Sequence, residues 1–240
     1  DVVNEINLHN KYQIRAIHIN HNVSKNADAM QNNCIDICNK LNINLTIKNI
    51  NSIEKSNVEE TLRNRRYKLI FESMSDNEVL LLGHHNNDQV ETFLYRLFRG
   101  SSPYGLSSMQ NISQRENKII CRPFLPISKD NIIQIGKKLN IKYIDDSSNS
   151  DLSFDRNYIR NEIIPKIKTR WRSVDNTMLH NISLQSDYSK LASDYCDSVY
   201  KNIVDNNKLN IKILKSYPCY QESTFLKYWI KSCCQYDLSR

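Results

Sequence analysis

Along the first 145 residues, short apolar runs alternate with segments in which apolar positions recur at helical spacing. Short apolar runs predict strands over residues 14–20, 44–50, 78–82, 118–121 and 142–144. Between these runs, apolar residues recur every three or four positions, which predicts helices over residues 27–41, 56–74, 88–98 and 128–139. Ser56 and Glu59 form a capping box, and Gly100 is a candidate C-cap. Strands that alternate with helices indicate βαβ units and a parallel sheet.

The pattern changes after residue 156. Helical spacing extends to about residue 204 with a break at Pro165, and a strand is expected over residues 209–214. A last helix begins near Gln221. We therefore expect an α/β fold, with a parallel sheet and flanking helices, followed by a mostly helical second domain. The two domains are expected over residues 1–170 and 171–240.

Polar side chains gather where the third predicted strand ends. His84, His85, Asn87 and Asp88 follow directly after the apolar run 79–82. In open α/β sheets, ligands lie beyond the carboxyl ends of the strands, so this segment is a candidate wall of an active site. A transition-metal site is one interpretation, but the spacing is not a recognised ligand pattern. Mg²⁺, held by Asp88 together with substrate phosphates, is a second interpretation. Helix capping by Asn87 and Asp88 is a third.

Two further segments carry basic side chains at suggestive spacings. Arg63 and Arg66 share one helix face, which could direct two guanidinium groups at phosphate or could simply be solvated. Later, Arg156 and Arg160 lie close to Phe154 and Tyr158. Basic side chains interleaved with aromatic rings suit an RNA backbone and an unstacked base, although many surface loops look similar. The basic run over residues 166–172 also favours a part of the surface that faces phosphate groups.

Composition narrows the class of protein. The net charge of +7 and the isoelectric point of about 9.0 favour a polyanionic partner. The 7 cysteines include no CxxC pair, which is typical of reduced thiols in a cytosolic protein. No apolar run is long enough to span a membrane, and the first residues lack the layout of a signal peptide. We expect a soluble, cytoplasmic protein that has no membrane contact.

Four blocks of sequence resemble the bacterial tRNA(Ile)-lysidine synthetases, members of the PP-loop (N-type) ATP pyrophosphatase superfamily. They keep the family's order and approximate spacing, and together they cover residues 16 to about 165. The blocks are AIHINHNVSKNADA from Ala16, R-x-x-R-Y from Arg63, HHNNDQVETFLYRLFRGSSPYGLSSM from His84, and RPFLPIS from Arg122 followed by DDSSNSDLSFDRNYIRNEIIP from Asp145.

The resemblance implies a Rossmann-like fold of the adenine nucleotide α-hydrolase type and a ligase reaction in tRNA modification. The family uses ATP to adenylate the C2 oxygen of the wobble cytidine in an isoleucine tRNA with a CAU anticodon. Free L-lysine then displaces AMP, which gives lysidine. ATP and Mg²⁺ are the implied cofactors, and tRNA and lysine are the implied partners. A homodimer remains open.

The resemblance also implies roles for particular residues. Asp88 is the candidate for a metal or ammonium contact, His85 for a neighbouring hydrogen bond, and Asn87 occupies the adjoining catalytic position. His21, Arg63 and Arg66 are expected to bind ATP. The positions expected to bind tRNA or to shape its loop are Arg122, Asp146, Asn149, Arg156, Asn157 and Arg160.

Two departures from the family's pattern limit what this sequence is expected to do. The usual H-x-D-D-Q reads His85 to Gln89 here with Asn87 in place of the first aspartate. The S-G-G-x-D-S phosphate loop and its strand do not occur, and the chain has only 4 glycines. Family members also continue into further C-terminal domains. We therefore expect an internal fragment, or the ordered part, of a longer protein, inactive by itself.

Three alternatives stay open. A tRNA 2-thiolation enzyme of the same superfamily also adenylates a base, but its iron–sulfur versions use paired cysteines. Other PP-loop ligases, which amidate free nucleotides or acids, would not need the basic end of the fourth block. A non-catalytic tRNA-binding remnant, degraded at the phosphate loop and at Asn87, belongs to a different functional class.

Overall fold

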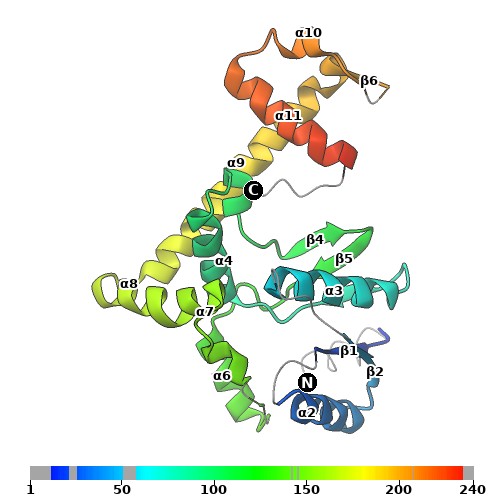
Figure 1. Ribbon diagram of the computed structural model, residues 1–240, viewed down its shortest axis with the longest axis vertical. Coiled ribbons are helices and arrows are strands. Elements are labelled where there is room, and N and C mark those ends of the chain that lie inside the picture. Colours follow the sequence, from blue (N-terminus) through cyan, green and yellow to red (C-terminus); the bar gives the residue numbers. More distant parts are fainter. Residues whose placement is uncertain are drawn as a thin grey trace. The chain divides into compact units, whose positions relative to one another are not determined.

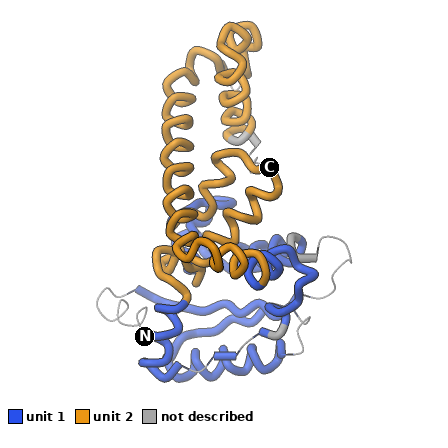
Figure 2. Tube along the Cα trace, turned by 90° about the vertical axis from the view of Figure 1, so that its left-hand side faces the viewer, with its two compact units in different colours: residues 1–82, 112–121, 130–161 blue, residues 83–111, 122–129, 162–240 orange. Residues whose placement is uncertain are grey.

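The computed structural model describes residues 12–21, 26–50, 58–141, 143–144, 146–206 and 208–234. The chain forms two compact units, each assembled from separate stretches of sequence (Figure 2). The first unit comprises residues 1–82, 112–121 and 130–161, and the second comprises residues 83–111, 122–129 and 162–240. The division into folding domains at residue 170 stays a prediction.

The first unit begins with a parallel βαβ arrangement. Strand β1 (Arg15–Asn20) leads through helix α2 (Ala27–Lys40) to strand β2 (Asn44–Asn49). The strands pair in parallel, from Arg15 opposite Asn44 to Asn20 opposite Asn49. Helices α2 and α3 (Val58–Glu72) flank the pair (Figure 1). The structure confirms the α/β class and these strands and helices.

A second set of strands in the same unit has a mixed arrangement. Strand β3 (Val79–Leu81) pairs in parallel with β5 (Lys118–Cys121), which pairs in antiparallel with β4 (Ile112–Arg115). Strand β4 was not predicted from the sequence. Glu116 and Asn117 connect β4 to β5 with φ angles of 49° and 61°, the positive values of a two-residue turn that matches hairpin twist.

One apolar core underlies both sets of strands. Tyr67, Ile70 and Phe71 project from α3, and they pack with Ile19 of β1 and Ile120 of β5. Burial of these side chains stabilises the unit because it removes apolar surface from water, at about 25 cal/mol per Å². The core therefore joins strand sets that share no backbone pairing among the described residues.

The second unit is mostly helical. Helix α9 (Val174–Ile203) is 30 residues long and contacts four helices, which are α4 (Asn86–Phe98), α5 (Pro103–Leu106), α10 (Ile211–Leu214) and α11 (Cys219–Cys234). At its C-terminal end, Cys196 and Ile203 pack with Leu214 and Phe225 in a second apolar core. Figure 1 shows α11 against this part of α9. The expected final helix is confirmed, beginning two residues early.

Three local predictions were wrong. Tyr143 and Ile144 lie outside any strand, whereas Lys142 is outside the described residues. Residues 208–209 form only a short strand, β7 (Lys208–Leu209), paired with β6 (Val204–Asp205). Helix α10 (Ile211–Leu214) follows because Asn210 Oδ1 accepts hydrogen bonds from the backbone N–H groups of Lys212 and Ile213, which caps the helix.

The third wrong prediction concerns Pro165. It does not break the helical region but lies in the first turn of α8 (Ile164–Arg170), where a missing N–H costs no hydrogen bond. The chain instead leaves the helix at residues 171–173. Preceding α8 are α6 (Lys129–Lys138), a 3-10 turn (Ser147–Ser150), α7 (Asp155–Tyr158) and a π turn (Ile159–Ile163). None of the helices in the described part of the chain is long and apolar enough to cross a membrane.

Candidate functional site

The polar segment after β3 forms the N-terminus of α4. His85 is the N-cap residue and Asp88 occupies the third helical position. Asp88 Oδ2 accepts a hydrogen bond of 2.9 Å from the backbone N–H of His85, and it lies 3.3 Å from His85 Nδ1. The helix therefore starts two residues before the predicted position. The negative charge of Asp88 near the helix N-terminus is favourable because the backbone N–H groups there carry partial positive charge.

Asn87 links this helix end to the segment that starts α6. Its Oδ1 accepts a hydrogen bond of 2.9 Å from the backbone N–H of Lys129. Nearby, the backbone N–H of Asn86 donates to the carbonyl oxygen of Ile127 over 3.0 Å. The Asn87 contact requires an acceptor oxygen and no charge. The amide therefore serves this contact as well as the family's usual carboxylate would. We call His85, Asn87 and Asp88 the strand-end group.

Buried polar side chains hold the loop that follows α4. Gln89 Nε2 donates to the carbonyl oxygen of Met109, and the backbone N–H of Met109 donates to Gln89 Oε1, both over 2.8 Å. Arg122 is buried, and its Nη1 donates to the carbonyl oxygen of Gln110 over 2.8 Å. Arg96 Nη1 donates to the carbonyl oxygens of Gly105 and Ser108. Gln89 and Arg96 were not predicted as functional residues from the sequence; their positions shortly before a Gly/Ser/Pro turn were the available signal.

The strand-end group by itself does not make a metal site. No group of three or more histidine, cysteine, aspartate or glutamate side chains among the described residues is placed to hold an ion. One oxygen of Asp88 is also engaged in the helix cap. A protein-only transition-metal site therefore finds no support within the described ranges. Mg²⁺ at Asp88 would depend on phosphate oxygens for its remaining ligands.

A second group of candidate residues lies together in the first unit. His21 directly follows β1, and Arg66 lies on α3. Burial lowers the pKa of His21; the charges of Arg66 and His18 lower it further, and Asp146 opposes them. Burial also lowers the pKa of Arg66, although the side chain remains exposed; Tyr67 opposes this effect, and the charges of Arg63 and Arg156 add to it. We call His21, Arg63, Arg66 and Arg156 the basic cluster.

The segment from Asp146 to Asn161 folds around amide side chains. Asn157 Nδ2 donates to the carbonyl oxygens of Ser148 and Asp151, over 2.8 and 2.9 Å. Arg160 Nη1 lies 3.5 Å from Asn149 Oδ1, at the long limit of a hydrogen bond. These contacts fix the loop that carries Asp146, and Arg156 extends from the same segment. Asp146 and Arg156, which are expected to bind tRNA, thus act electrostatically on His21 and Arg66, which are expected to bind ATP.

The remaining positions divide between the units. The strand-end group and Arg122 belong to the second unit, whereas the basic cluster, Asp146, Asn149, Asn157 and Arg160 belong to the first.

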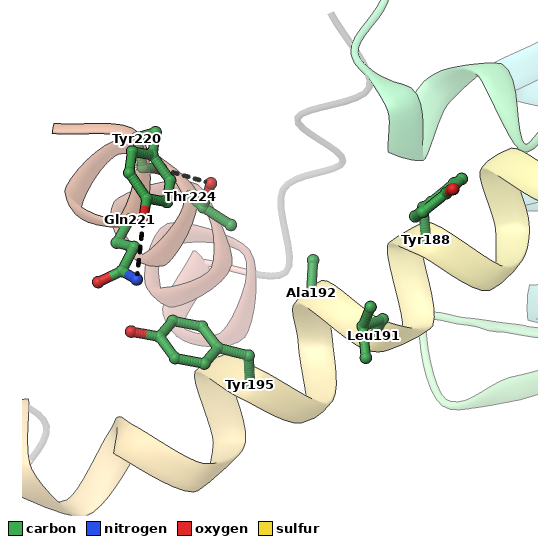
Figure 3. Close-up of a pocket in the computed structure, with 7 residues that line it drawn as sticks. All are labelled: Tyr188, Leu191, Ala192, Tyr195, Tyr220, Gln221 and Thr224. Carbon is green, nitrogen blue, oxygen red and sulfur yellow. Dashed lines mark hydrogen bonds between the residues drawn. The ribbon is translucent and has the colours of Figure 1, made fainter. Parts of the chain in front are cut away.

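The second unit also carries a groove that the sequence analysis did not identify. It has a volume of about 410 Å³ and lies between α9 and α11 (Figure 3). Tyr188 and Tyr220 are largely exposed there, at 64% and 69%. The helical spacing of residues 188, 191 and 195 was the available signal. The groove is lined by Tyr188, Leu191, Ala192, Tyr195, Tyr220, Gln221 and Thr224, none of them a predicted site residue.

Two curated relatives match most of the chain. The tRNA(Ile)-lysidine synthase of Wigglesworthia glossinidia brevipalpis is 38% identical over 200 residues, which are 82% of this chain and 50% of that protein. The tRNA(Ile)-lysidine synthase of Buchnera aphidicola subsp. Acyrthosiphon pisum (strain APS) is 38% identical over 220 residues, 91% of this chain and 50% of that protein. The chain thus spans about half the length of these relatives.

A solved structure and a family model both support the α/β fold of this chain. The U34-tRNA thiolase NcsA from Methanococcus maripaludis, solved with its 4Fe–4S cluster, superposes with a TM-score of 0.60. It is 13% identical, over 77% of this chain and 67% of that one, so the likeness concerns the fold alone. The family model of the PP-loop domain matches residues 1–167. This match takes in both the strand-end group and the basic cluster, and the chain belongs to the PP-loop domain family.

Proposed function

We propose that this chain is the nucleotide- and tRNA-handling part of an ATP-dependent ligase. The enzyme would join L-lysine to C2 of the wobble cytidine in an isoleucine tRNA with a CAU anticodon. The observation that carries this proposal is the 38% identity to tRNA(Ile)-lysidine synthases over 82% and 91% of the chain. Membership of the PP-loop family supports ATP as the nucleotide.

The proposed reaction has two steps. The C2 oxygen of the cytidine attacks the α-phosphate of ATP, and pyrophosphate leaves. The amine of lysine then attacks C2, the C2–oxygen bond breaks, and AMP departs while the amine loses a proton. The first step requires phosphate groups held against their mutual repulsion, and the second requires a neutral amine.

The strand-end group suits the second step in this proposal. Asp88 is only partly exposed, so its carboxylate can hold the lysine ammonium or accept its proton with little competition from water. His85 Nδ1 lies 3.3 Å from the Oδ2 atom of this carboxylate. Asn87 holds the start of α6 and positions the helix end. Mg²⁺ would arrive bound to the ATP phosphates, with Asp88 as one carboxylate contact.

The basic side chains suit the anionic substrates. His21, Arg63 and Arg66 are assigned to ATP. His21 directly follows the carboxyl end of β1, where ligands bind in open α/β sheets, and Arg63 and Arg66 lie on α3. Those assigned to tRNA contacts or to the shape of the tRNA-binding loop are Arg122, Asp146, Asn149, Arg156, Asn157 and Arg160. Within this scheme residues 1–170 form the catalytic domain, and residues 171–240 begin a helical domain for tRNA. A cytoplasmic homodimer is the proposed form.

Incorporation of labelled lysine into bulk bacterial tRNA tests the proposal. The purified full-length protein should transfer label only when ATP is present, and pyrophosphate should appear in equal amount. Label should be absent when the tRNA pool lacks the isoleucine tRNA with a CAU anticodon. Transfer of labelled sulfur in place of lysine would favour the thiolation enzymes. Binding of tRNA without transfer of either label would favour the non-catalytic remnant.

A further inference from the structure

Trp171 is exposed at the corner between two helices of the second unit. It is 63% exposed and begins the segment 171–173, which connects α8 to α9 (Figure 1). Folded proteins bury most of the surface of a typical tryptophan. In the described part of the chain, the ring contacts involve tyrosine, phenylalanine and arginine side chains, and none of them covers this indole. The indole therefore offers a flat apolar surface to a binding partner.

Hydrogen bonds and an ion pair hold the backbone of this corner. The N–H of Trp171 donates to the carbonyl oxygen of Ile167 over 2.9 Å, and the carbonyl oxygen of Trp171 accepts from the N–H of Val174 over 3.1 Å. Lys168 Nζ lies 2.5 Å from Asp175 Oδ2, which links the last turn of α8 to the first turn of α9. The backbone that carries the indole is therefore held on both sides.

The charges next to Trp171 are not balanced. The two lysines of α8 each face a carboxylate, Lys166 at 3.2 Å and Lys168 at 2.5 Å. Arg170 and Arg172 are both exposed, and neither forms an ion pair or a side-chain hydrogen bond with a described residue. Because adjacent Cα atoms lie about 3.8 Å apart, both arginines start within one residue of the indole. Two uncompensated positive charges thus flank Trp171.

A single-stranded nucleic acid complements both features of this surface. Its bases have flat faces that stack on aromatic rings, and its phosphate oxygens match the fork of a guanidinium group. An apolar segment of another protein would bury the indole but would bring no negative charge to the arginines. We infer that Trp171, Arg170 and Arg172 form a contact surface for single-stranded RNA. A base stacks on the indole, and phosphate groups bind the two arginines.

This surface adds three residues to those assigned to tRNA above. The choice of RNA over DNA rests on the proposed function, whereas base stacking and phosphate contact do not. Proteins recognise RNA mostly at unpaired loops, where bases are free to leave their own stack. The tRNA of the proposed reaction offers such bases, and the RNA-binding surface would extend to the corner of α8 and α9.

Indole fluorescence tests the stacking directly. The chain has 2 tryptophans, and Trp229 on α11 is half-buried. A short single-stranded RNA should quench part of the tryptophan emission of the protein, and this quenching should disappear in Trp171→Phe. Unchanged emission at saturating RNA would overturn the inference. So would an emission of Trp171 that shifts to shorter wavelength with protein concentration and not with RNA, because a protein partner would then cover the indole.

Binding measurements separate the ring from the charges. Trp171→Ala should weaken the affinity for the same RNA about tenfold and leave the slope of log affinity against log salt unchanged, because no charge is lost. Trp171→Phe keeps an aromatic ring and should retain most of the affinity. A double variant with glutamine at Arg170 and Arg172 should reduce the slope by about 1.4, the change expected for two phosphate contacts on a single strand.

Two matched controls lie in the same unit. Tyr188→Ala removes a ring that is 64% exposed, and it should keep the wild-type affinity. Glutamine at both Lys212 and Lys215 removes two exposed charges and should keep the wild-type slope. Unchanged affinity in Trp171→Ala, or an equal loss in Tyr188→Ala, would refute the contact surface. A loss in Trp171→Ala that phenylalanine does not restore would refute base stacking there.

Lysine transfer separates the failure of this inference from the failure of the proposed function. RNA binding that depends on Trp171, without lysine transfer by the full-length protein, would refute the proposed activity and leave the contact surface. Lysine transfer together with unchanged RNA affinity in Trp171→Ala would refute the contact surface and leave the activity.

Discussion

Arg15 and Glu78 form a two-point ion pair that joins β1 to the residue before β3. Arg15 Nε lies 2.5 Å from Glu78 Oε1, and Nη2 lies 2.7 Å from Oε2. The same carboxylate accepts a hydrogen bond of 2.7 Å from the backbone N–H of Ser75. Because β1 and β3 belong to separately paired sets of strands, this ion pair connects the two sets at their edges.

The pair predicts an acid-sensitive part of the stability. Hydrogen bonding from Arg15, and then from the Ser75 N–H, lowers the pKa of Glu78 to about 2. A depressed carboxyl pKa contributes stability that is complete above the unfolded value, near 4.5, and is lost as the pH falls toward 2. The free energy of unfolding should therefore fall more steeply between pH 4.5 and 2 in the wild type than in Glu78→Gln. Urea unfolding at a series of pH values measures this difference.

At neutral pH, Glu78→Gln should cost about 1 kcal/mol, since the pair is bidentate but partly exposed. Glu72→Gln is the matched control. Its partner, Lys68, lies 3.9 Å away on the helix surface, so its loss should change stability by less than about 0.5 kcal/mol. Equal pH profiles for all three proteins would contradict the prediction.

Gln89 should be required for folding and not for chemistry. Gln89→Leu removes both partners of the Met109 backbone, so unfolding free energy should fall by about 2 kcal/mol. The matched control is Gln110→Leu, whose side chain is exposed and has only a long contact of 3.5 Å to Ser107. Urea unfolding compares the two variants. A stable Gln89→Leu protein that has lost lysine transfer would assign the residue to the reaction instead.

Asp88 offers a way to separate charge from helix capping. Asn keeps an oxygen that can accept from the His85 N–H, whereas Ala removes both oxygen atoms. Asp88→Asn should therefore abolish lysine transfer and leave tRNA binding nearly intact, with a stability loss below about 1 kcal/mol. Asp88→Ala should lose about 1 kcal/mol or more through the cap.

The two variants are compared in labelled-lysine transfer, tRNA binding and urea unfolding. Loss of transfer and of tRNA binding together in Asp88→Asn would indicate a structural role. Full transfer activity in Asp88→Asn would refute the assignment to the ammonium or the metal.

Arg156 and Arg160 should contribute to tRNA affinity through phosphate contacts. The double variant with alanine at both positions should bind tRNA more weakly and reduce the slope of log affinity against log salt by about 2. A control with alanine at Lys68 and Lys190, both exposed cations, should keep the wild-type slope. Filter binding at several salt concentrations measures the slopes. An unchanged slope in the arginine variant would refute the tRNA assignment.

The sequence predicted the regular elements well and the irregular ones poorly. Apolar runs identified β1, β2, β3 and β5 because β1, β3 and β5 contribute side chains to or beside the core, and Ile50, which belongs to the core, directly follows β2. Gly100 was correctly predicted to end α4, since it adopts a φ of 69° and its N–H donates to the carbonyl oxygen of Leu97. Strand β4 was missed because its sequence, ISQR, has no apolar alternation and its turn has no glycine. The capping box of Ser56 and Glu59 lies outside the described side chains.

In the candidate site too, features with a local sequence signal could be predicted, whereas contacts between distant segments could not. Asp88 and Arg66 were proposed from residue type and spacing, because carboxylates after a strand and paired arginines on a helix are local signals. The electrostatic effects of Asp146 on His21 and of Arg156 on Arg66 could not be inferred from the sequence, because these residues come from distant segments. The structural use of Asn87 was also hidden, because its partner is a backbone N–H 42 residues away.

A single apolar core beneath two separately paired sets of strands has a dynamic consequence. Neither set can open without exposing Tyr67, Phe71 and the other side chains that cover its neighbour. The amide hydrogens of β1 and β5 should therefore exchange with solvent through the same opening event, at one common rate under native conditions. The two sets would then behave as a single cooperative element, although the backbone does not connect them.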